Sequence, residues 1–171
     1  EQNLLSLIYG HIIRKDINTN VVLLPASFST YNIVYKNDII IRPTDLQNDK
    51  RSLRTGLVTE RGIITSAYID LRPLDGVNSE YYHYLLHAYD IMKVFYNMGN
   101  GVRQGLNYSE FSKLLVLEPS SEEQRTIVSY LNDKCEQINS IIAAELDRLN
   151  ELQSYKKSII YEVVTGKRKV V

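Results

Sequence analysis

The chain has 171 residues and a formal net charge of zero, with 20 lysines and arginines against 20 aspartates and glutamates. This balance excludes wholesale electrostatic attraction to a polyanion, so any nucleic-acid site must be local. At 44% apolar and 23% charged residues, the composition is that of one foldable domain with an attached element. No apolar run approaches the roughly 18 residues of a membrane helix, so we expect no membrane partner.

Cysteine and tyrosine usage point to the compartment and to binding. The single cysteine, Cys135, cannot form an internal disulfide, and no secretory leader is visible. A reducing intracellular compartment is therefore expected. The chain has 13 tyrosines against 3 phenylalanines and no tryptophan. Because tyrosine combines an apolar ring with a polar tip, this excess suits a binding surface.

Residues 1–118 are predicted to form a mixed α/β domain of the α+β class, because they hold seven of the eight glycines and all the short β-branched runs. The opening stretch NLLSLIYG starts abruptly, as though a first strand were missing. Strands are expected over 31–35 and 38–43, which the short spacing could also join into one interrupted strand. Two further strands are expected between 56 and 73, with a turn at Arg61 and Gly62.

A helix is predicted to begin at Ser79 as its N-cap and to end at Gly99. Its apolar face is expected to contain residues at helical spacing, namely Tyr81, Leu85, Ala88, Met92 and Phe95. The run LLVLEP, residues 114–119, is predicted to be a short buried strand that leads into the rest of the chain.

Residues 119–171 are predicted to form one long helix, over about 121–165, and a short basic tail. Ser120 followed by Glu123 fits a capping box, and neither proline nor glycine occurs between Pro119 and Gly166. Gly166 can end the helix in a left-handed conformation, with three cations just beyond it. The helix would be roughly 65 Å long at about 1.5 Å per residue.

Apolar side chains recur along this helix at steps of three, four or seven residues, which indicates a seam for another helix. The predicted seam consists of Val128, Leu131, Cys135, Ile138, Ile142, Leu149, Leu152, Ile159 and Val163. We expect it to pair as an antiparallel coiled coil with a second copy, since a two-fold interface lets one patch bury itself. The alternative is an amphipathic helix that folds back on its own domain.

Catalytic motifs are not found. No phosphate-binding loop, dinucleotide fingerprint or amino-methyltransferase motif is present, so we predict no catalytic residue and no cofactor. His83 and His87 have an i, i+4 spacing that can bind a metal, but a packed or solvated pair is favoured. Four acids could be imagined as a nuclease-like metal cluster, namely Asp38, Asp45, Asp49 and Glu60. The favoured interpretation is that they are solvated loop residues.

Two polar segments are suited to DNA. Lysine and arginine can pair with phosphates, whereas Arg, Asn and Gln can form bidentate hydrogen bonds with base edges. A solvated loop explains the first segment equally well, and a flexible turn explains the second. The candidate contacts are Arg42, Gln47, Asn48, Lys50, Arg51 and Arg54 in residues 42–56, and Arg103 and Gln104 in the glycine-rich residues 99–107.

Four stretches together resemble the DNA-specificity subunits of type I restriction-modification systems. They are NLLSLIYGHIIRKDI, residues 35–73, the junction GNGVRQGLNYSEFSKLLVLEPSSEEQRTIVSYLN and the terminal LQSYKKSIIYEVVTGK. The resemblance covers nearly the whole chain. Its most distinctive parts are the Pro-Ser-Ser-Glu-Glu-Gln helix start in the junction and the closing Thr-Gly-Lys.

The resemblance implies a non-catalytic subunit with one target-recognition domain and one conserved helical region, about half the family's usual content. It implies binding to a bipartite target in double-stranded DNA, and docking of methyltransferase subunits that bind S-adenosylmethionine and methylate adenine. A motor subunit would cleave DNA, in the cytoplasm of a bacterium or archaeon. A natural half-subunit, a product of gene rearrangement and a fragment are the three alternatives for this half content. The main alternative is a coiled-coil protein-interaction module without DNA specificity, and an enzyme is the least expected class.

Overall fold

The computed structural model describes residues 3–15, 28–46, 53–98 and 105–170. The chain divides into two compact units, Glu1–Val128 and Ser129–Val171. The predicted boundary at Pro119 therefore lies close to the boundary between the units, but the first two turns of the long helix belong with the first unit.

The first unit opens with an antiparallel hairpin of β1, Leu5–Ile8, and β2, His11–Arg14. Leu5 and Leu7 point inward and are almost fully buried. The opening stretch therefore forms strands of its own, and a missing first strand stays a prediction.

The remaining strands of the first unit form two small antiparallel sheets. In one, β3, Asn32–Val34, pairs with β6, Gly62–Ile64. In the other, β4, Ile39–Ile41, lies between β5, Thr55–Leu57, and β7, Ile69–Leu71. The reading of 31–43 as one interrupted strand is wrong, because β3 and β4 belong to different sheets. The prediction of two strands between 56 and 73 is also wrong, because a second turn at residues 65–68 divides that run into three.

The core lies on both faces of the central strand β4. Ile39 and Ile41 pack with Leu86 and Phe95 on one face, whereas Ile40 packs with a second cluster that includes Leu5, Val34 and Ile64. All three isoleucines are 5% exposed or less. An uninterrupted apolar run therefore marks a strand that is covered on both sides.

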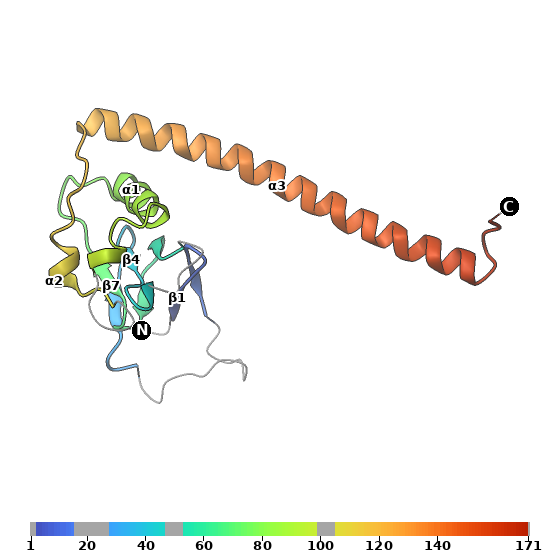
Figure 1. Ribbon diagram of the computed structural model, residues 1–171, viewed down its shortest axis with the longest axis horizontal. Coiled ribbons are helices and arrows are strands. Elements are labelled where there is room, and N and C mark those ends of the chain that lie inside the picture. The colour runs from blue at the N-terminus through green and yellow to red at the C-terminus, as the bar shows by residue number, and fades with distance from the viewer. Residues whose placement is uncertain (1–2, 16–27, 47–52, 99–104, 171) are drawn as a thin grey trace. The chain divides into compact units, whose positions relative to one another are not determined.

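The helix α1, Ser79–Ile91, lies beside the sheets and packs on β5 (Figure 1). Its N-cap is Asn78, whose side chain accepts a hydrogen bond from the Tyr81 backbone at 3.1 Å, so the predicted cap is displaced by one residue. The predicted extension toward Gly99 is wrong, because the helix ends at Ile91, Met92 is its C-cap and Lys93 takes a φ of +59°. The face of α1 that is buried consists of Ser79, Tyr81, Leu86 and Asp90, so Tyr81 is confirmed and Leu85, Ala88 and Met92 are not. Phe95 is fully buried beyond the helix end.

A short helix α2, Tyr108–Phe111, follows, and the predicted strand at 114–119 does not form. Leu115, Val116 and Leu117 are exposed by 88%, 44% and 65%. No partner strand pairs with this run in the part of the chain that the structure describes, so its apolar side chains stay at the surface.

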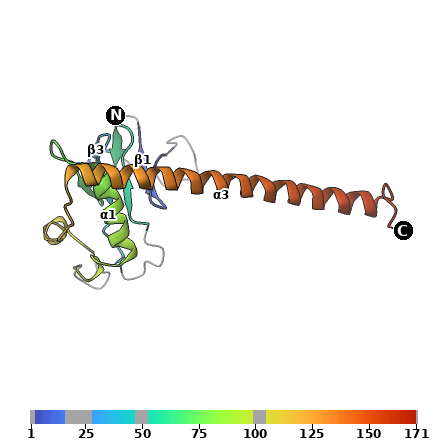
Figure 2. The same cartoon turned by 90° about the horizontal axis from the view of Figure 1, so that it is seen from above.

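The helix α3, Ser121–Val164, confirms the predicted long helix and is continuous in both views (Figures 1 and 2). The Ser120 hydroxyl accepts a hydrogen bond from the Glu123 backbone at 3.2 Å, as the capping box predicts. Gly166 has a φ of +73°, and the Arg168 N–H donates to the Glu162 carbonyl at 2.9 Å, which closes the helix end. Neither α3 nor any other helix of the described residues combines the length and the apolarity that crossing a bilayer requires.

Gly62 marks a close approach between β6 and the residues before β1. A Cβ atom at this position would lie 2.6 Å from the Asn3 carbonyl oxygen, which also accepts the Ile63 N–H at 2.9 Å. Since the clash is with backbone, we expect Gly62→Ala to lower the free energy of unfolding by about 1–3 kcal/mol. Urea unfolding measures it. Gly105→Ala, where a Cβ meets nothing within 4 Å, is the control and should change little.

Candidate nucleic-acid interface

The connection between β4 and β5, residues 42–54, carries most of the predicted DNA contacts. Its ends are joined by the Arg42 N–H, which donates to the Arg54 carbonyl at 2.9 Å. Arg42 is half-buried at the edge of this connection. Four of the predicted contacts lie outside the described residues: Gln47, Asn48, Lys50 and Arg51.

Arg54 has a different position from the one expected of a DNA contact. It is 2% exposed, and its guanidinium donates to the carbonyls of Arg42 at 3.2 Å and Asp45 at 2.7 Å, and to that of Thr44. The prediction that Arg54 binds DNA is therefore wrong for this structure, because the charge is directed at the protein's own backbone. It holds residues 42–45 in place.

Asp90 fixes the same region from α1, although no motif in the sequence singles it out. This fully buried carboxylate accepts the Arg54 backbone N–H at 2.9 Å and the Tyr96 hydroxyl at 2.7 Å. The Arg54 guanidinium also lies over the Tyr96 ring, 5.8 Å from its centroid. An acid on the inner face of a helix was the available signal, since a buried charge in a folded protein needs hydrogen-bond partners.

The structure brings the two predicted binding segments together. The Leu106 N–H, at the end of the glycine-rich segment, donates to the Pro43 carbonyl at 2.9 Å. Asn107 then caps α2 by accepting the Glu110 N–H at 2.9 Å. Arg103 and Gln104 lie outside the described residues. The described ends of the two segments thus meet at one place in the first unit.

A pocket of about 480 Å³ opens at this meeting point. Pro43 and Leu106 contribute to it from the two segments. Polar side chains from β3, the β6–β7 turn, β7 and the α2 cap supply much of the remaining wall: Asn32, Ser66, Asp70 and Asn107.

Asp70 lies next to a strong ion pair. Arg72 donates to Asp38 through Nε at 3.2 Å and through a terminal nitrogen at 2.9 Å, and the latter is 3.8 Å from Asp70 Oδ2. Burial, with the nearby Asp38 charge adding to it and Arg72 opposing it, raises the pKa of Asp70 to about 6 from an ordinary 3.8. Its buried Oδ1 has no hydrogen-bond partner within the described residues.

The sign of the Asp70 effect on stability follows from its raised pKa. Between about pH 4 and 6 the folded chain holds a proton at Asp70 that the unfolded chain releases, so this group favours folding more as the pH falls. At pH 7 the buried charge opposes folding. We expect Asp70→Asn to unfold at higher urea than the wild type at pH 7, with the difference vanishing below about pH 4. Equal midpoints at pH 7 would contradict this.

His83, on α1, has the opposite dependence. Burial lowers the pKa of His83 to about 4 from an ordinary 6.5, with His87 and His11 adding to the shift. Between these values the unfolded chain binds a proton that the folded chain does not, so stability is full above pH 6.5 and falls toward pH 4. The total loss is about 3 kcal/mol.

We expect His83→Gln, which cannot titrate, to flatten the acid side of the stability curve by this amount. Urea midpoints between pH 4 and 7 measure it, and parallel curves for wild type and variant would refute it. The three histidines do not form a metal site: no group of three potential ligands among the described residues is placed to hold a metal ion.

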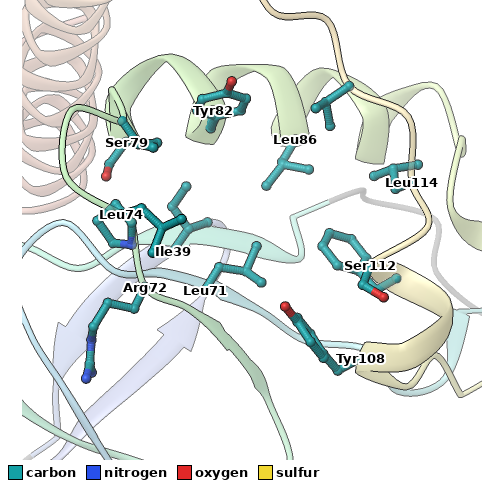
Figure 3. Close-up of a pocket in the computed structure, with 14 residues that line it drawn as sticks. Ile39, Leu71, Arg72, Leu74, Ser79, Tyr82, Leu86, Tyr108, Ser112 and Leu114 are labelled. Carbon is teal, nitrogen blue, oxygen red and sulfur yellow. The ribbon is translucent and has the colours of Figure 1, made fainter.

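A second pocket, of about 470 Å³, lies between α1, β7 and the segment after α2 (Figure 3). Tyr82 and Leu86 of α1 face Ile39 and Leu71 of the sheet, with Tyr108 to one side. Its wall is mainly apolar, and Arg72 is the charged residue in its lining. This composition suits an apolar side chain and not a phosphate.

Most of the predicted helix seam is exposed in the second unit. Ile138, Ile142, Leu149 and Leu152 are 50–58% exposed, and the free Cys135 is also exposed. Leu131, Ile159 and Val163 are partly exposed. Val128 is an exception: it is 7% exposed within the first unit, so its assignment to the pairing interface is wrong.

The apolar face of α3 is wider than predicted. Four side chains that flank the seam at helical spacing are exposed by more than half: Ile141, Leu146, Tyr155 and Ile160. These were missed because only the positions of the two-helix repeat were considered.

Comparisons with known proteins concern the fold. No protein-family model and no curated protein matches the sequence. The chain is similar to one in a structure that addresses complex assembly and conformational transition of the type I R-M system, with 19% identity and a TM-score of 0.62. It is also similar to the HsdS subunit from Thermoanaerobacter tengcongensis, with 19% identity and a TM-score of 0.53.

These alignments cover 77% and 76% of this chain but only 31% and 30% of the other chains. The chain thus spans about a third of the length of the structures it resembles. The structures agree with the expected class, a small mixed α/β domain followed by a long helix. Pairing of that helix stays a prediction.

Proposed function

We propose that this chain is a DNA-specificity module of a type I restriction-modification complex. It recognises one part of a bipartite target in double-stranded DNA, directs adenine methylation and restriction to it, and is itself non-catalytic. The observation that carries the proposal is the HsdS-like fold, in which two polar segments meet at the Leu106–Pro43 hydrogen bond.

In this proposal the residues that contact DNA belong to the two segments, without Arg54. Phosphate contacts set the position on the duplex, and base-edge contacts set the sequence. Arg54 and Asp90 serve as positioning residues for the first segment. The proposed contacts are Arg42, Gln47, Asn48, Lys50, Arg51, Arg103 and Gln104.

The proposed partners bind through α3. Methyltransferase subunits carrying S-adenosylmethionine dock on the helical region in the cytoplasm, and a motor subunit joins the complex through them. A second copy of the chain supplies the other half of the target: its α3 covers the exposed seam, because a two-fold interface is self-complementary. An interrupted palindrome is then the expected target.

Methylome sequencing tests the proposal in cells with and without the gene. Loss of adenine methylation at one bipartite motif, with other methylation unchanged, is the expected result. An unchanged methylome in cells that contain the partner genes would refute it. That outcome would favour a coiled-coil interaction module, which the zero net charge and the wide apolar face of α3 support.

Two substitutions separate base reading from phosphate contact. We expect Arg103→Ala to lower discrimination between target and scrambled DNA by about 1–3 kcal/mol. Lys50→Ala should weaken binding to both DNAs alike and flatten the salt dependence. Fluorescence anisotropy at several salt concentrations measures both. Equal losses on the two DNAs for Arg103→Ala would remove it from the base contacts.

A further inference from the structure

The pocket between the two binding segments has a size and a wall that suit part of a nucleobase. Its volume of about 480 Å³ lies within the range of small-molecule sites. One residue from each segment, Pro43 and Leu106, forms part of the wall. A group that enters this pocket therefore contacts both segments at once.

Charge decides what kind of group the pocket accepts. Arg72 neutralises Asp38 through two hydrogen bonds, at 3.2 and 2.9 Å, and reaches Asp70 only at 3.8 Å. Arg72 thus neutralises the charge of Asp70 less than that of Asp38. Of these two acids, only Asp70 lines the pocket. A phosphate would be repelled by it, whereas a hydrogen-bond donor would be attracted.

The carboxylate of Asp70 is also only partly satisfied by its neighbours within the described residues. Its side chain is 16% exposed, and its buried Oδ1 has no hydrogen-bond partner among the described residues. The other oxygen, Oδ2, lies 3.8 Å from the Arg72 guanidinium, which is beyond hydrogen-bond distance. The carboxylate can therefore accept a hydrogen bond from a group that enters the pocket.

We propose that Asp70 is a specificity-determining residue, which accepts a hydrogen bond from the exocyclic amino group of a target cytosine or adenine. In the major groove these are the base-edge donors, N4 of cytosine and N6 of adenine, whereas guanine and thymine present carbonyl oxygens. The carboxylate attracts the amino groups of cytosine and adenine and repels the carbonyl oxygens of guanine and thymine. It therefore both favours the correct base and disfavours the wrong one. This inference rests on the proposed function and adds the chemical group that is read.

The test is a double-mutant cycle that combines one substitution in the protein with one base analogue in the DNA. The full chain, with its methyltransferase subunits, is bound to its methylome-derived target, in which each adenine or cytosine in turn is replaced by an analogue without the amino group. At one position the analogue should weaken wild-type binding by about 5- to 150-fold. Asp70→Ala should lose a similar factor on the normal target, and the analogue should then cause no further loss.

Asp75→Asn, which changes an exposed acid outside this pocket, is the matched control and should behave as wild type at every position. Asp70→Asn retains one neutral acceptor oxygen and should lose less than Asp70→Ala, which keeps the test usable if the alanine variant folds poorly. Additive losses at every position, or wild-type tolerance of every analogue, would overturn the inference and leave the proposed function standing. A wild-type complex without sequence preference would instead refute the proposed function, and this inference with it.

Discussion

Asp90→Ala is expected to lower the free energy of unfolding by about 3–5 kcal/mol, because it removes the acceptor of two buried hydrogen bonds to a charged group. The donors left behind are the Arg54 backbone N–H and the Tyr96 hydroxyl, both of which lie in the interior. Urea unfolding at pH 7 measures the loss. DNA binding by the variant should also weaken at temperatures below the one at which the variant unfolds, because Asp90 holds Arg54 and Arg54 positions residues 42–45.

Two variants check the origin of this effect. Tyr96→Phe removes only one of the two hydrogen bonds and should cost about 1–2 kcal/mol. Asp75→Ala changes an exposed acid and should be nearly neutral. A loss below about 1 kcal/mol for Asp90→Ala would show that these hydrogen bonds do not hold the first unit together.

Ile142→Asp is expected to raise the dissociation constant of the proposed dimer by about 100-fold or more. Ile142 is 51% exposed in the single chain, and each copy would bury it in the shared seam. Burial of an isoleucine is worth about 1.5–3 kcal/mol, the change occurs twice in a two-fold dimer, and each new carboxylate adds a desolvation cost. Sedimentation velocity over a concentration series measures the constant.

Ser140→Asp is the matched control, because residue 140 lies on the face of α3 opposite to the seam. It introduces the same charge and should leave the dimer unchanged. A wild-type chain that sediments as a monomer at micromolar concentration, with Ile142→Asp identical to it, would contradict pairing between copies. The exposed seam would then belong to a partner of another kind.

Local signals predicted the long helix well and the strands only in part. The Ser120 cap, the absence of glycine before Gly166 and the repeat of apolar residues all act within a few positions, so α3 was predicted to within a residue or two. The predicted buried strand at 114–119 is wrong, although its apolar residues satisfy the same local pattern. Whether such a run pairs depends on a partner strand, which adjacent sequence does not encode.

The candidate site shows the same division. Both polar segments are predictions from the sequence, and the structure joins their described ends through Leu106 and Pro43. Arg54 was counted among the DNA contacts because an arginine in a polar connection is normally exposed. Its burial depends on Asp90, 36 residues along the chain, and on carbonyls that only the folded connection brings together.

Periodicity and helix caps, which act within a few residues, are enough to predict the class of the fold, the length and ends of α3 and the apolar stripe along it. The inward direction of Arg54, its hydrogen bond to Asp90 and the place of Asp70 at the pocket follow from the folded chain alone. Burial and hydrogen bonds join residues that lie far apart in the sequence, and neither composition nor spacing shows which of these residues meet.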